Sequence, residues 1–318
     1  MSHVIISSCT NRKSRAASSW HFDLPIGENS LSKCAYSWAT HVSTSRLDGR
    51  QVIKVLDLYQ GRTFTDAMRV SNSIDSELFV VSAGLGLVSA EDLVIPYDLT
   101  LMDRQNPLGK MLAELGATSS QWWTALTGTG LGFGSLSTLV RSKSSAIIML
   151  ALPSTYLTMV HEDLMSLSDS ELRRIRLLTH PSSQSRLPQR LRSLVLPYDE
   201  RLQSEQGFAG TRSDFAQRAL SHFVLKLKAE SLPLADAVEV VSEAMGKLNV
   251  VTLPDRKRAT DKEIIAHIAD HWDRTNGHGN RLLRVLRDEL LVSCEQGRFQ
   301  GLWRQFKRGM DSAGELVA

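Results

Sequence analysis

The sequence predicts an α/β protein, with a short, mainly parallel sheet covered by helices on both faces and a helical C-terminal region. Three observations lead to this prediction. Short apolar runs alternate with segments of helical spacing, which is typical of parallel strands buried on both faces. Each apolar run ends in a polar motif. Beyond about residue 205 the apolar runs give way to helical spacing alone.

Four apolar runs are the predicted strands. Two of them are His3–Ser8, which leads into Cys9-Thr10-Asn11-Arg12-Lys13, and 78–81, which leads into Ser82-Ala83-Gly84. The other two are 146–152, followed by Pro153, and 194–196, followed by Pro197-Tyr198-Asp199. Helices are predicted between the strands, for example over 64–71 and 155–165. Because ligands bind beyond the carboxyl ends of parallel strands, the polar motifs are predicted to share one site.

Two segments interrupt this alternation. Residues 16–50 are Ser-rich and weakly periodic, which predicts a surface excursion. Residues 118–137 contain Trp122-Trp123 and a glycine-rich run at 128–134. The spacing of these glycines does not fit the GxGxxG fingerprint of a dinucleotide loop, and no strand precedes them. A mobile loop over the site is therefore favoured over a nucleotide-binding loop.

The polar, Gly-containing segment 203–210 is the predicted boundary between an α/β domain, 1–205, and a helical, basic, DNA-binding domain, 206–318. In the second domain, helical spacing covers 212–228 and 234–248, and Thr260 opens a capped helix. A turn at 275–280 leads into a helix at 281–292 that carries Arg281, Arg284 and Arg287, in the outline of a helix-turn-helix. A basic helix is predicted at 298–308.

Composition narrows the classes of function. The chain has 318 residues, of which 42% are hydrophobic, and a formal net charge of +3, which permits nucleic-acid binding without requiring it. The cysteines Cys9, Cys34 and Cys294 are far apart, which favours a reduced, cytoplasmic compartment. No apolar run approaches the roughly 20 residues that span a bilayer, so no membrane association is predicted. Nothing indicates an obligate protein partner.

Asp98 is the predicted catalytic carboxylate. It follows Pro96-Tyr97, one loop length from the glycine turn at Ser82. In the cleavage of a glycosidic bond, a carboxylate stabilises an oxocarbenium-like transition state or orients water. The alternative is that Asp98 caps a turn or a helix. Asp199, in the second Pro-Tyr-Asp, is the reserve candidate.

Asn11 is the second predicted catalytic residue. Its amide can read a base edge or position water, and the adjacent Arg12 and Lys13 can hold phosphate. The alternative is a polar helix start on a solvated edge. Tyr59 and Phe64 flank a turn, where two rings either sandwich a flipped base or anchor the loop, and both interpretations remain open.

Two other patterns have competing interpretations. His267 and His271 are spaced as in HxxxH, but no third zinc ligand is evident, so a solvated or packed helix face is favoured. Residues 172–192 hold six arginines and no acid, which indicates either a phosphate-facing patch or a solvated helix face. No GxSxG or Walker A motif occurs. We therefore predict no metal and no cofactor.

Three ordered motifs carry a resemblance to a known family. SCTNRK after the first strand, DLYQGRTFTDA, and SAGLGLV followed by IPYDLTL resemble a bacterial and phage family of uncharacterised domains. That family is similar to YaaA-type proteins and, more distantly, to the uracil-DNA glycosylase fold. The motifs lie between residues 3 and 101, and the resemblance to the sheet core extends to about 200. It implies a three-layer α/β/α sandwich whose strand ends handle nucleobases in nucleic acid, with relatives that excise modified bases in defence against phages.

The resemblance also implies a set of site residues. Carried over from the family, Cys9, Thr10 and Asn11, Ser82, Ala83 and Gly84, and Tyr97 and Asp98 would line the base and sugar pocket. The aromatic residues Tyr59 and Phe64 are added to this pocket from their own place in the sequence, as rings that would stack on the base. One departure concerns the carboxylate: a uracil glycosylase has its Asp before Pro-Tyr, whereas Asp98 follows Pro96-Tyr97. Independently of the resemblance, the basic residues predicted to hold the DNA backbone are Arg12, Lys13, Arg62, Arg212, Lys257, Arg258, Arg281 and Arg284.

These inferences predict a monofunctional DNA glycosylase that flips a modified base into the pocket and hydrolyses its N-glycosidic bond. DNA is the predicted partner. No lyase activity at abasic sites is predicted, because no lysine is clearly placed as a Schiff-base nucleophile. Two alternatives remain, a non-catalytic DNA-binding or stress-response protein and a nucleoside base-exchange transferase. The basic helical region argues against the transferase.

Overall fold

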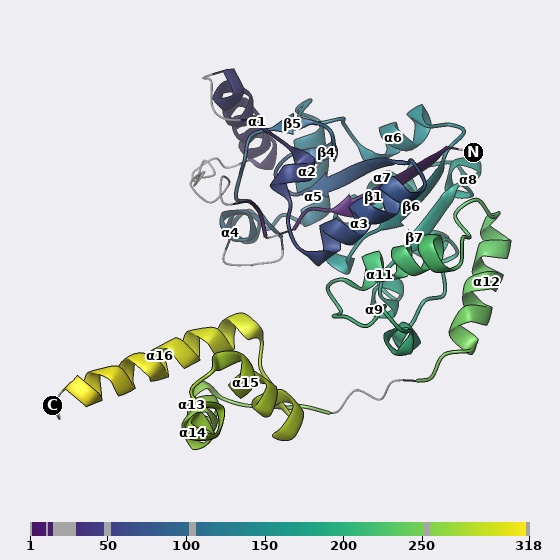
Figure 1. Ribbon diagram of the computed structural model, residues 1–318. Coiled ribbons are helices and arrows are strands. Elements are labelled where there is room, and N and C mark those ends of the chain that lie inside the picture. Colours follow the sequence, from purple (N-terminus) through teal and green to yellow (C-terminus); the bar gives the residue numbers. More distant parts are fainter. Residues whose placement is uncertain are drawn as a thin grey trace. The chain divides into compact units, whose positions relative to one another are not determined.

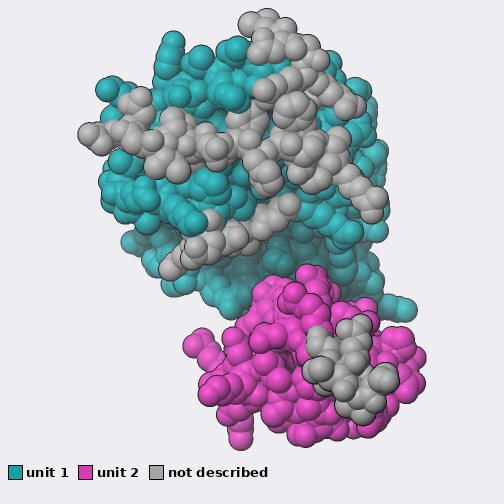
Figure 2. All heavy atoms as spheres, turned by 90° about the vertical axis from the view of Figure 1, so that its left-hand side faces the viewer, with its two compact units in different colours: residues 1–251 teal, residues 252–318 magenta. Residues whose placement is uncertain are grey.

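The chain folds into two compact units. The computed structural model describes residues 2–10, 12–14, 30–47, 52–101, 106–250 and 255–315. Unit 1 spans residues 1–251 and unit 2 spans residues 252–318 (Figures 1 and 2). Each unit has a hydrophobic core of its own. The protein is therefore a mixed α/β unit followed by a small, largely helical one.

A mainly parallel sheet forms the centre of unit 1. Within the described residues it has five strands in the order β4-β3-β1-β6-β7. Their bounds are β1 His3–Ser8, β3 Glu77–Ser82, β4 Gly86–Ser89, β6 Ile147–Ala151 and β7 Ile175–Leu178. β1 pairs in parallel with β3 (Ile5↔Leu78) and with β6 (Ile5↔Met149), whereas β4 is antiparallel to β3. A separate antiparallel pair joins β2 (Ile53–Lys54) to β5 (Leu93–Val94).

Both faces of this sheet are covered. Successive residues of β1 point to opposite faces, yet Val4, Ile5 and Ile6 are all fully buried. The chain moves from β1 to β3 in one direction along the sheet and from β6 to β7 in the other. Because such crossovers are right-handed, their helices lie on opposite faces. This double burial explains why the strands read as continuous apolar runs in the sequence.

The helices of unit 1 form around the sheet. α3 (Arg62–Ser73) packs against β1 and β3, α11 (Phe215–Ser221) packs against β6 and β7, and the two helices lie side by side (Figure 1). α7 (Ser154–Met165) is the crossover helix after β6, and α5 (Ser119–Thr127) packs against it. The remaining helices are α2 Val55–Leu58, α4 Pro107–Glu114, α6 Leu136–Ser142, α8 Asp169–Leu172, α9 Pro181–Gln184, α10 Gln189–Arg192, η2 Glu200–Ser204, η3 His222–Lys226 and α12 Leu234–Gly246.

Two segments predicted as irregular contain helices that pack against the core. α1 (Leu31–Leu47) lies within the predicted surface excursion; residues 16–29 and 48–50 of that segment lie outside the described residues. Cys34, Trp38 and Val42 recur every four residues along α1 and are buried. In place of the predicted mobile loop, α5 begins at a Thr118–Gln121 capping box and buries Trp122. The polar residues between these buried side chains weaken the apolar periodicity, so the sequence did not predict either helix.

The position predicted for the fourth strand is also wrong. Residues 194–196 contribute only an isolated bridge, Leu177↔Val195. The strand beside β6 is β7, which lies inside the arginine-rich segment 172–192. Arg176 belongs to β7, is 2% exposed, and donates to the carbonyl oxygens of Arg173, Ile175 and Leu232. Because this buried arginine interrupts the apolar run, the sequence indicated a basic patch where the strand lies.

The division at 251/252 differs from the boundary predicted at 205/206. α11 belongs to unit 1, where the Gln217 amide donates to the Ser7 hydroxyl and to the Ala151 carbonyl. Arg218 pairs with Asp214 at 2.7 Å and donates to the carbonyl oxygens of Phe208 and Thr211. The polar, glycine-containing segment is thus a loop held by a buried guanidinium rather than a linker.

Unit 2 is a small helical bundle. Its elements are β8 Lys257–Arg258, α13 Asp261–Asp270, α14 Trp272–Thr275, α15 Gly279–Arg284, η4 Val285–Glu289, β9 Val292–Ser293 and α16 Gln296–Glu315. The predicted cap of α13 is confirmed: the Thr260 hydroxyl accepts from the Glu263 N–H, and the Glu263 carboxylate accepts from the Thr260 N–H. Asn276 and Gly277 have left-handed φ values of 52° and 66° and separate α14 from α15. This arrangement agrees with the predicted helix-turn-helix outline.

In the part of the chain that the structure describes, no helix is both long and apolar enough to cross a membrane.

We predict that a fragment ending at residue 251 folds, whereas one ending at 205 does not. The shorter fragment lacks Phe215, Leu220 and Phe223, which are buried in the core of unit 1. At about 1.5–3 kcal/mol per side chain, this loss is comparable with the net stability of a typical domain, about 5–15 kcal/mol. Thermal unfolding followed by circular dichroism should be cooperative for 1–251 only. A cooperative transition for 1–205 would show that α11 is dispensable.

Candidate functional site

The strand order places a switch point between β1 and β6. The chain leaves β1 towards β3 on one side and later returns to β6 on the other side of β1. In open sheets of this kind, ligands bind in the crevice beyond the carboxyl ends of the two strands at the switch. Cys9 follows β1 directly, and Tyr156 lies in the first turn of α7, just after β6.

A hydrogen bond joins the two sides of the switch point. The Cys9 Sγ lies 2.9 Å from the Tyr156 hydroxyl, and both side chains are buried. The Cys9 N–H donates to the Val81 carbonyl at 3.0 Å, so the backbone here is tied to β3 as well. Cys9 therefore lies where the carboxyl ends of β1, β3 and β6 meet. Sequence reasoning missed Tyr156; its only signal was its place a few residues after a predicted strand.

A second chain of hydrogen bonds runs from Ser82 through Tyr97 to Tyr59. The Tyr97 hydroxyl lies 2.6 Å from the Ser82 Oγ and 2.7 Å from the Tyr59 hydroxyl. The Ser82 Oγ also accepts from the N–H groups of Gly84 and Leu85. Since both lone pairs of this oxygen are occupied, Ser82 donates to Tyr97, and Tyr97 donates to Tyr59. We refer to Cys9, Tyr59, Ser82, Tyr97 and Tyr156 as the strand-end network.

The tyrosines of the strand-end network are neutral. Burial, followed by electrostatic interaction with Cys9, raises the pKa of Tyr59, Tyr97 and Tyr156 above the ordinary value of a tyrosine. These hydroxyls therefore keep their protons at neutral pH and remain hydrogen-bond donors. Neutral, mutually bonded groups can be buried without the cost of an unpaired charge.

The predicted glycine turn is packed against this network. Two indole N–H groups hold it: Trp122 donates to the Ala83 carbonyl at 2.8 Å, and Trp38 donates to the Gly84 carbonyl at 2.5 Å. A Cβ on Gly84 would lie 2.5 Å from Cε2 of the Tyr97 ring. The turn thus serves the close approach of an aromatic ring. Neither tryptophan was predicted to take part.

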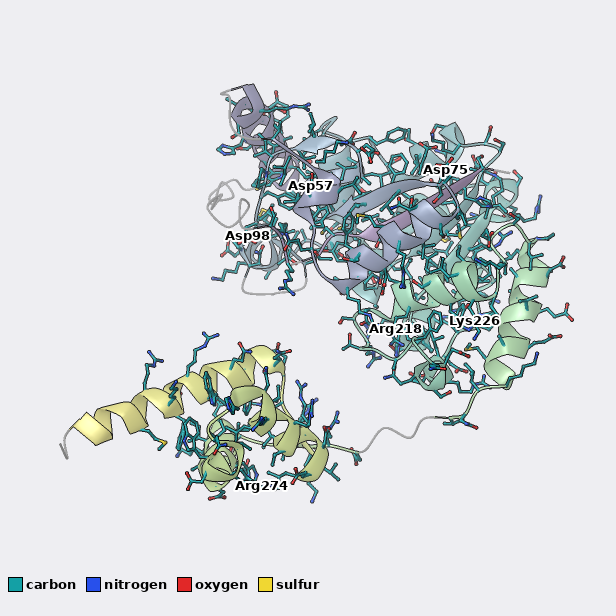
Figure 3. All side chains as sticks on the ribbon, viewed as in Figure 1. Asp57, Asp75, Asp98, Arg218, Lys226 and Arg274 are labelled. Atoms are coloured by element: carbon teal, nitrogen blue, oxygen red, sulfur yellow. The ribbon has the colours of Figure 1, made fainter. Side chains whose placement is uncertain are left out.

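Lys13 and Asp98 lie at the rim of the strand-end network. The Lys13 Nζ is 4.7 Å from the centroid of the Tyr97 ring. Burial lowers the pKa of the Lys13 ammonium, while electrostatic interaction with Cys9 and Asp98 acts in the opposite direction. Asp98 follows Tyr97 directly and is exposed (Figure 3). The site therefore combines buried neutral donors with an amine and an accessible carboxylate.

The first motif is described only in part, because Asn11 lies outside the described residues. The Thr10 hydroxyl donates to the carbonyl oxygens of Arg12 and Gln60, so it fixes the loop. Arg12 is exposed, and its carbonyl also accepts from the Gln60 N–H at 2.8 Å. Residues 12–14 therefore lie along residues 58–60.

Tyr59 and Phe64 meet edge to face, with ring centroids 5.6 Å apart. Both rings are buried, Tyr59 at the end of α2 and Phe64 in the first turn of α3. This geometry corresponds to the interpretation in which the two rings anchor a loop. Tyr59 belongs to the site through its hydroxyl rather than through an open ring face.

Arg62 and Arg212 are engaged within unit 1. The Arg62 guanidinium lies 3.4 Å from Asp66 and 3.9 Å from Asp214, and Arg212 donates to the Ser182 hydroxyl. Both arginines remain exposed. The structure does not bring them into the strand-end network.

Asp199 is committed to a local role. Its carboxylate accepts from the Arg201 backbone N–H at 2.9 Å and from the Arg201 guanidinium at 2.6 Å, which caps η2. These hydrogen bonds lower the pKa of Asp199. The preceding Tyr198 is buried, and its hydroxyl lies 3.0 Å from His222 Nδ1. The second Pro-Tyr-Asp therefore differs from the first, in which the carboxylate is exposed and has no side-chain ion pair among the described residues.

The basic residues predicted in unit 2 are open to solvent. Lys257, Arg258, Arg281 and Arg284 are exposed, and within the described part of the chain none forms a side-chain ion pair. Other arginines of unit 2 are paired, as shown by Arg274 with Glu289 at 2.7 Å. Arg281 and Arg284 are three residues apart on α15, so they share one helix face.

The arginine-rich segment 172–192 is largely structural. Arg174 donates to the carbonyl oxygens of Val140, Lys143 and Ala146, and Arg190 donates to those of Met165 and Leu167. With Arg176 in β7, these side chains hold loops together through backbone acceptors. Their guanidinium groups are thus occupied in the fold, against the interpretation as a phosphate-facing patch.

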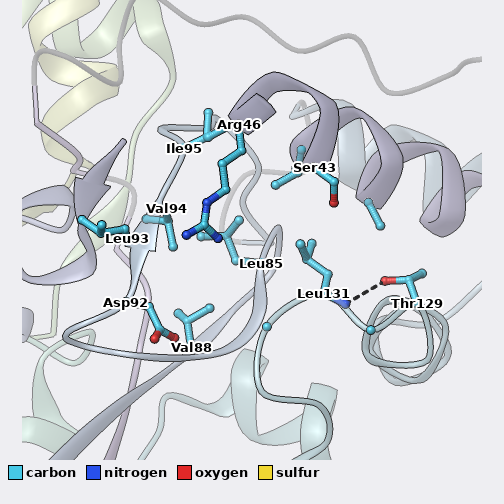
Figure 4. Close-up of a pocket in the computed structure, with 14 residues that line it drawn as sticks. Ser43, Arg46, Leu85, Val88, Asp92, Leu93, Val94, Ile95, Thr129 and Leu131 are labelled. Carbon is cyan, nitrogen blue, oxygen red and sulfur yellow. Dashed lines mark hydrogen bonds between the residues drawn. The ribbon is translucent and has the colours of Figure 1, made fainter. Parts of the chain in front are cut away.

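A cavity of about 410 Å³ lies between α1, β4 and the glycine-rich segment (Figure 4). Its lining includes Arg46, Leu85, Asp92, Ile95 and Gly132. A Cβ on Gly132 would lie 2.6 Å from the carbonyl oxygens of Leu85 and Leu87, so this wall is built from closely packed backbone. The glycine-rich segment is therefore a wall of this cavity.

Metal ligation receives no support from the described side chains. Among them, no group of three or more His, Cys, Asp or Glu residues could hold a metal ion. The His267 and His271 pair instead contributes a helix-end contact, in which the His271 ring nitrogen Nδ1 lies 3.0 Å from the His267 carbonyl.

Comparison with known proteins found a family match for one part of the chain. Residues 41–116 match a family model described as "Family of unknown function (DUF6884)". Neither the curated proteins nor the solved structures contain a match to the chain. The matched residues include Tyr59, Ser82, Tyr97 and Asp98.

We predict that Gly84→Ala destabilises the protein by about 1–3 kcal/mol. The new methyl group would collide with the Tyr97 ring, which is 1% exposed and has no room to move. Gly246→Ala, at the end of α12, is the matched control because its Cβ meets nothing within 4 Å. Urea denaturation should separate the two variants, and equal stabilities would show that the Tyr97 contact is not a constraint.

Proposed function

We propose that the protein is a DNA glycosylase that hydrolyses the N-glycosidic bond of a modified base, with unit 1 carrying the reaction and unit 2 holding DNA. The fold we propose for unit 1 is the uracil-DNA-glycosylase-like sandwich. One observation carries the proposal: an exposed carboxylate, Asp98, follows Tyr97, whose buried neutral hydroxyl is bonded to Ser82 at the carboxyl end of β3 and to Tyr59.

The chemistry of glycosidic cleavage fits these groups. Departure of the base leaves positive charge on the sugar, and a nearby carboxylate stabilises that charge or orients the attacking water. Asp98 has this role. The strand-end network below it is rigid, because each of its hydroxyls is bonded to another part of the fold. This rigid network keeps the Asp98 carboxylate in place without neutralising its charge.

Unit 2 supplies the features expected of a DNA-binding module. It has a separate core, a turn between helices, and, on the helix that follows the turn, exposed arginines that form no ion pair with the described residues. Helix-turn-helix modules contact DNA through that second helix. This observation also favours the second candidate function, a non-catalytic DNA-binding protein.

We predict that Asp98→Asn lowers the rate of base release by about 10²–10³-fold without changing duplex binding. The assay incubates the protein with DNAs carrying different base modifications and measures free base together with alkali-labile sites. Asp236→Asn, an exposed carboxylate in the first turn of α12, is the matched control and should retain the rate. Asp199→Asn should also retain it, because Asp199 is occupied by Arg201.

The outcomes separate the candidate functions. No product from any modified DNA, with duplex binding retained, favours the non-catalytic protein. Release of base from free nucleosides alone favours the base-exchange transferase. A loss of activity in Asp199→Asn but not in Asp98→Asn contradicts the assignment of the carboxylate.

We predict that replacing Arg281 and Arg284 by alanine reduces the dependence of DNA affinity on salt. Each lost phosphate contact should lower the slope of log K against log salt by about 0.9. Arg274→Ala is the control, since Arg274 is paired with Glu289 in the same unit. Fluorescence anisotropy between low and high salt measures the slope. An unchanged slope in the double variant would place the DNA contact elsewhere.

A further inference from the structure

Lys13 is held at the site by its backbone. The Gln60 N–H donates to the Arg12 carbonyl at 2.8 Å, and the Ser14 N–H donates to the Leu58 carbonyl at 2.9 Å. Lys13 itself forms a β-bridge with Tyr59. Hydrogen bonds on both sides of Lys13 therefore fix its Cα directly beside the strand-end network.

The Lys13 amine lies over an aromatic ring at its far end. Its Nζ lies 4.7 Å from the centroid of the Tyr97 ring, and the side chain is half-buried. Burial is the largest influence on its protonation and lowers its pKa, which increases the fraction of neutral, nucleophilic amine. Asp98 is close enough for its charge to act on Lys13. An amine and a carboxylate therefore interact electrostatically at the rim of the strand-end network.

We propose that Lys13 gives this protein a second activity, cleavage of the DNA strand at the abasic site, through a Schiff base with C1′ of the deoxyribose. The proposal rests on the proposed function for the origin of the abasic site, but the lyase step itself needs only an abasic site in DNA. The other nucleophile nearby, Cys9, is enclosed and bonded to Tyr156.

The reaction requires only water and protons. The neutral Lys13 nitrogen adds to the C1′ aldehyde of the ring-opened abasic sugar, and water leaves to give an iminium ion. Asp98 accepts a proton from C2′, and the electron pair released forms the C1′–C2′ enamine. The enamine then expels the 3′ phosphate as the C3′–O bond breaks. Hydrolysis of the conjugated iminium regenerates Lys13 and leaves an unsaturated aldehyde on the 5′ fragment.

Borohydride trapping tests this proposal. The full-length protein is incubated with duplex DNA containing one preformed abasic site in the presence of sodium borohydride, which reduces an iminium to a stable amine. We expect a covalent protein–DNA adduct that mass spectrometry maps to Lys13, and strand cleavage when borohydride is omitted. Lys13→Ala should lose both adduct and cleavage.

Two further variants control for folding and charge. Lys13→Arg keeps a positive charge but cannot form the iminium, so it should also lose the adduct while retaining duplex binding and a cooperative unfolding transition. Lys110→Ala, an exposed lysine of α4, is the matched control and should retain the adduct. An adduct that persists in Lys13→Arg, or that maps to another lysine, overturns the proposal.

The preformed site separates this proposal from the proposed function. Trapping at Lys13 without release of any modified base supports the lyase and counts against the glycosylase. Base release with no trapping on bound abasic DNA supports a monofunctional glycosylase and overturns the lyase.

Discussion

The contact between Tyr97 and the Ser82–Gly84 turn is the constraint on which the site depends. The ring occupies the space that a Cβ on Gly84 would fill, and its hydroxyl joins Ser82 to Tyr59. This one side chain therefore ties the end of β3 to the segment before α3. It also sets the position of Asp98, the next residue, and provides the surface on which the Lys13 amine lies. A shift of the ring would move the amine and the carboxylate together.

Much of the fold was predictable because a strand that is buried on both faces appears in the sequence as a continuous apolar run. β1, β3 and β6 are continuous apolar runs, and all three were predicted. β7 was missed because Arg176 interrupts its apolar character, and one of the carbonyl oxygens that accept from this arginine, that of Leu232, lies 56 positions further along the chain. The boundary at 205/206 was misplaced for a similar reason. Nothing in 203–210 reveals that Arg218, further along the chain, holds that loop.

The site was predictable where its residues follow a strand directly. Cys9, Ser82 and Gly84 are of this kind, and Tyr97 and Asp98 were predicted because they follow the glycine turn within one loop length. Hydrogen bonds between distant segments were not predictable, since the Cys9–Tyr156 contact joins residues 147 positions apart. The two copies of Pro-Tyr-Asp differ because Arg201, two residues beyond Asp199, captures one carboxylate. The role of Lys13 depends on the Tyr97 ring beneath its amine, which no local pattern reveals.

The cover that α11 gives to the sheet has a consequence for folding. The hydrogen bond between Ser7 and Gln217 spans 210 positions of the chain. During synthesis at about 5–20 residues per second, Ser7 emerges roughly 10–40 s before Gln217. β6 and β7, against which α11 packs, are without this helix until it has been made, whereas α3 already covers β1. Such long-range closure slows folding and exposes aggregation-prone surface.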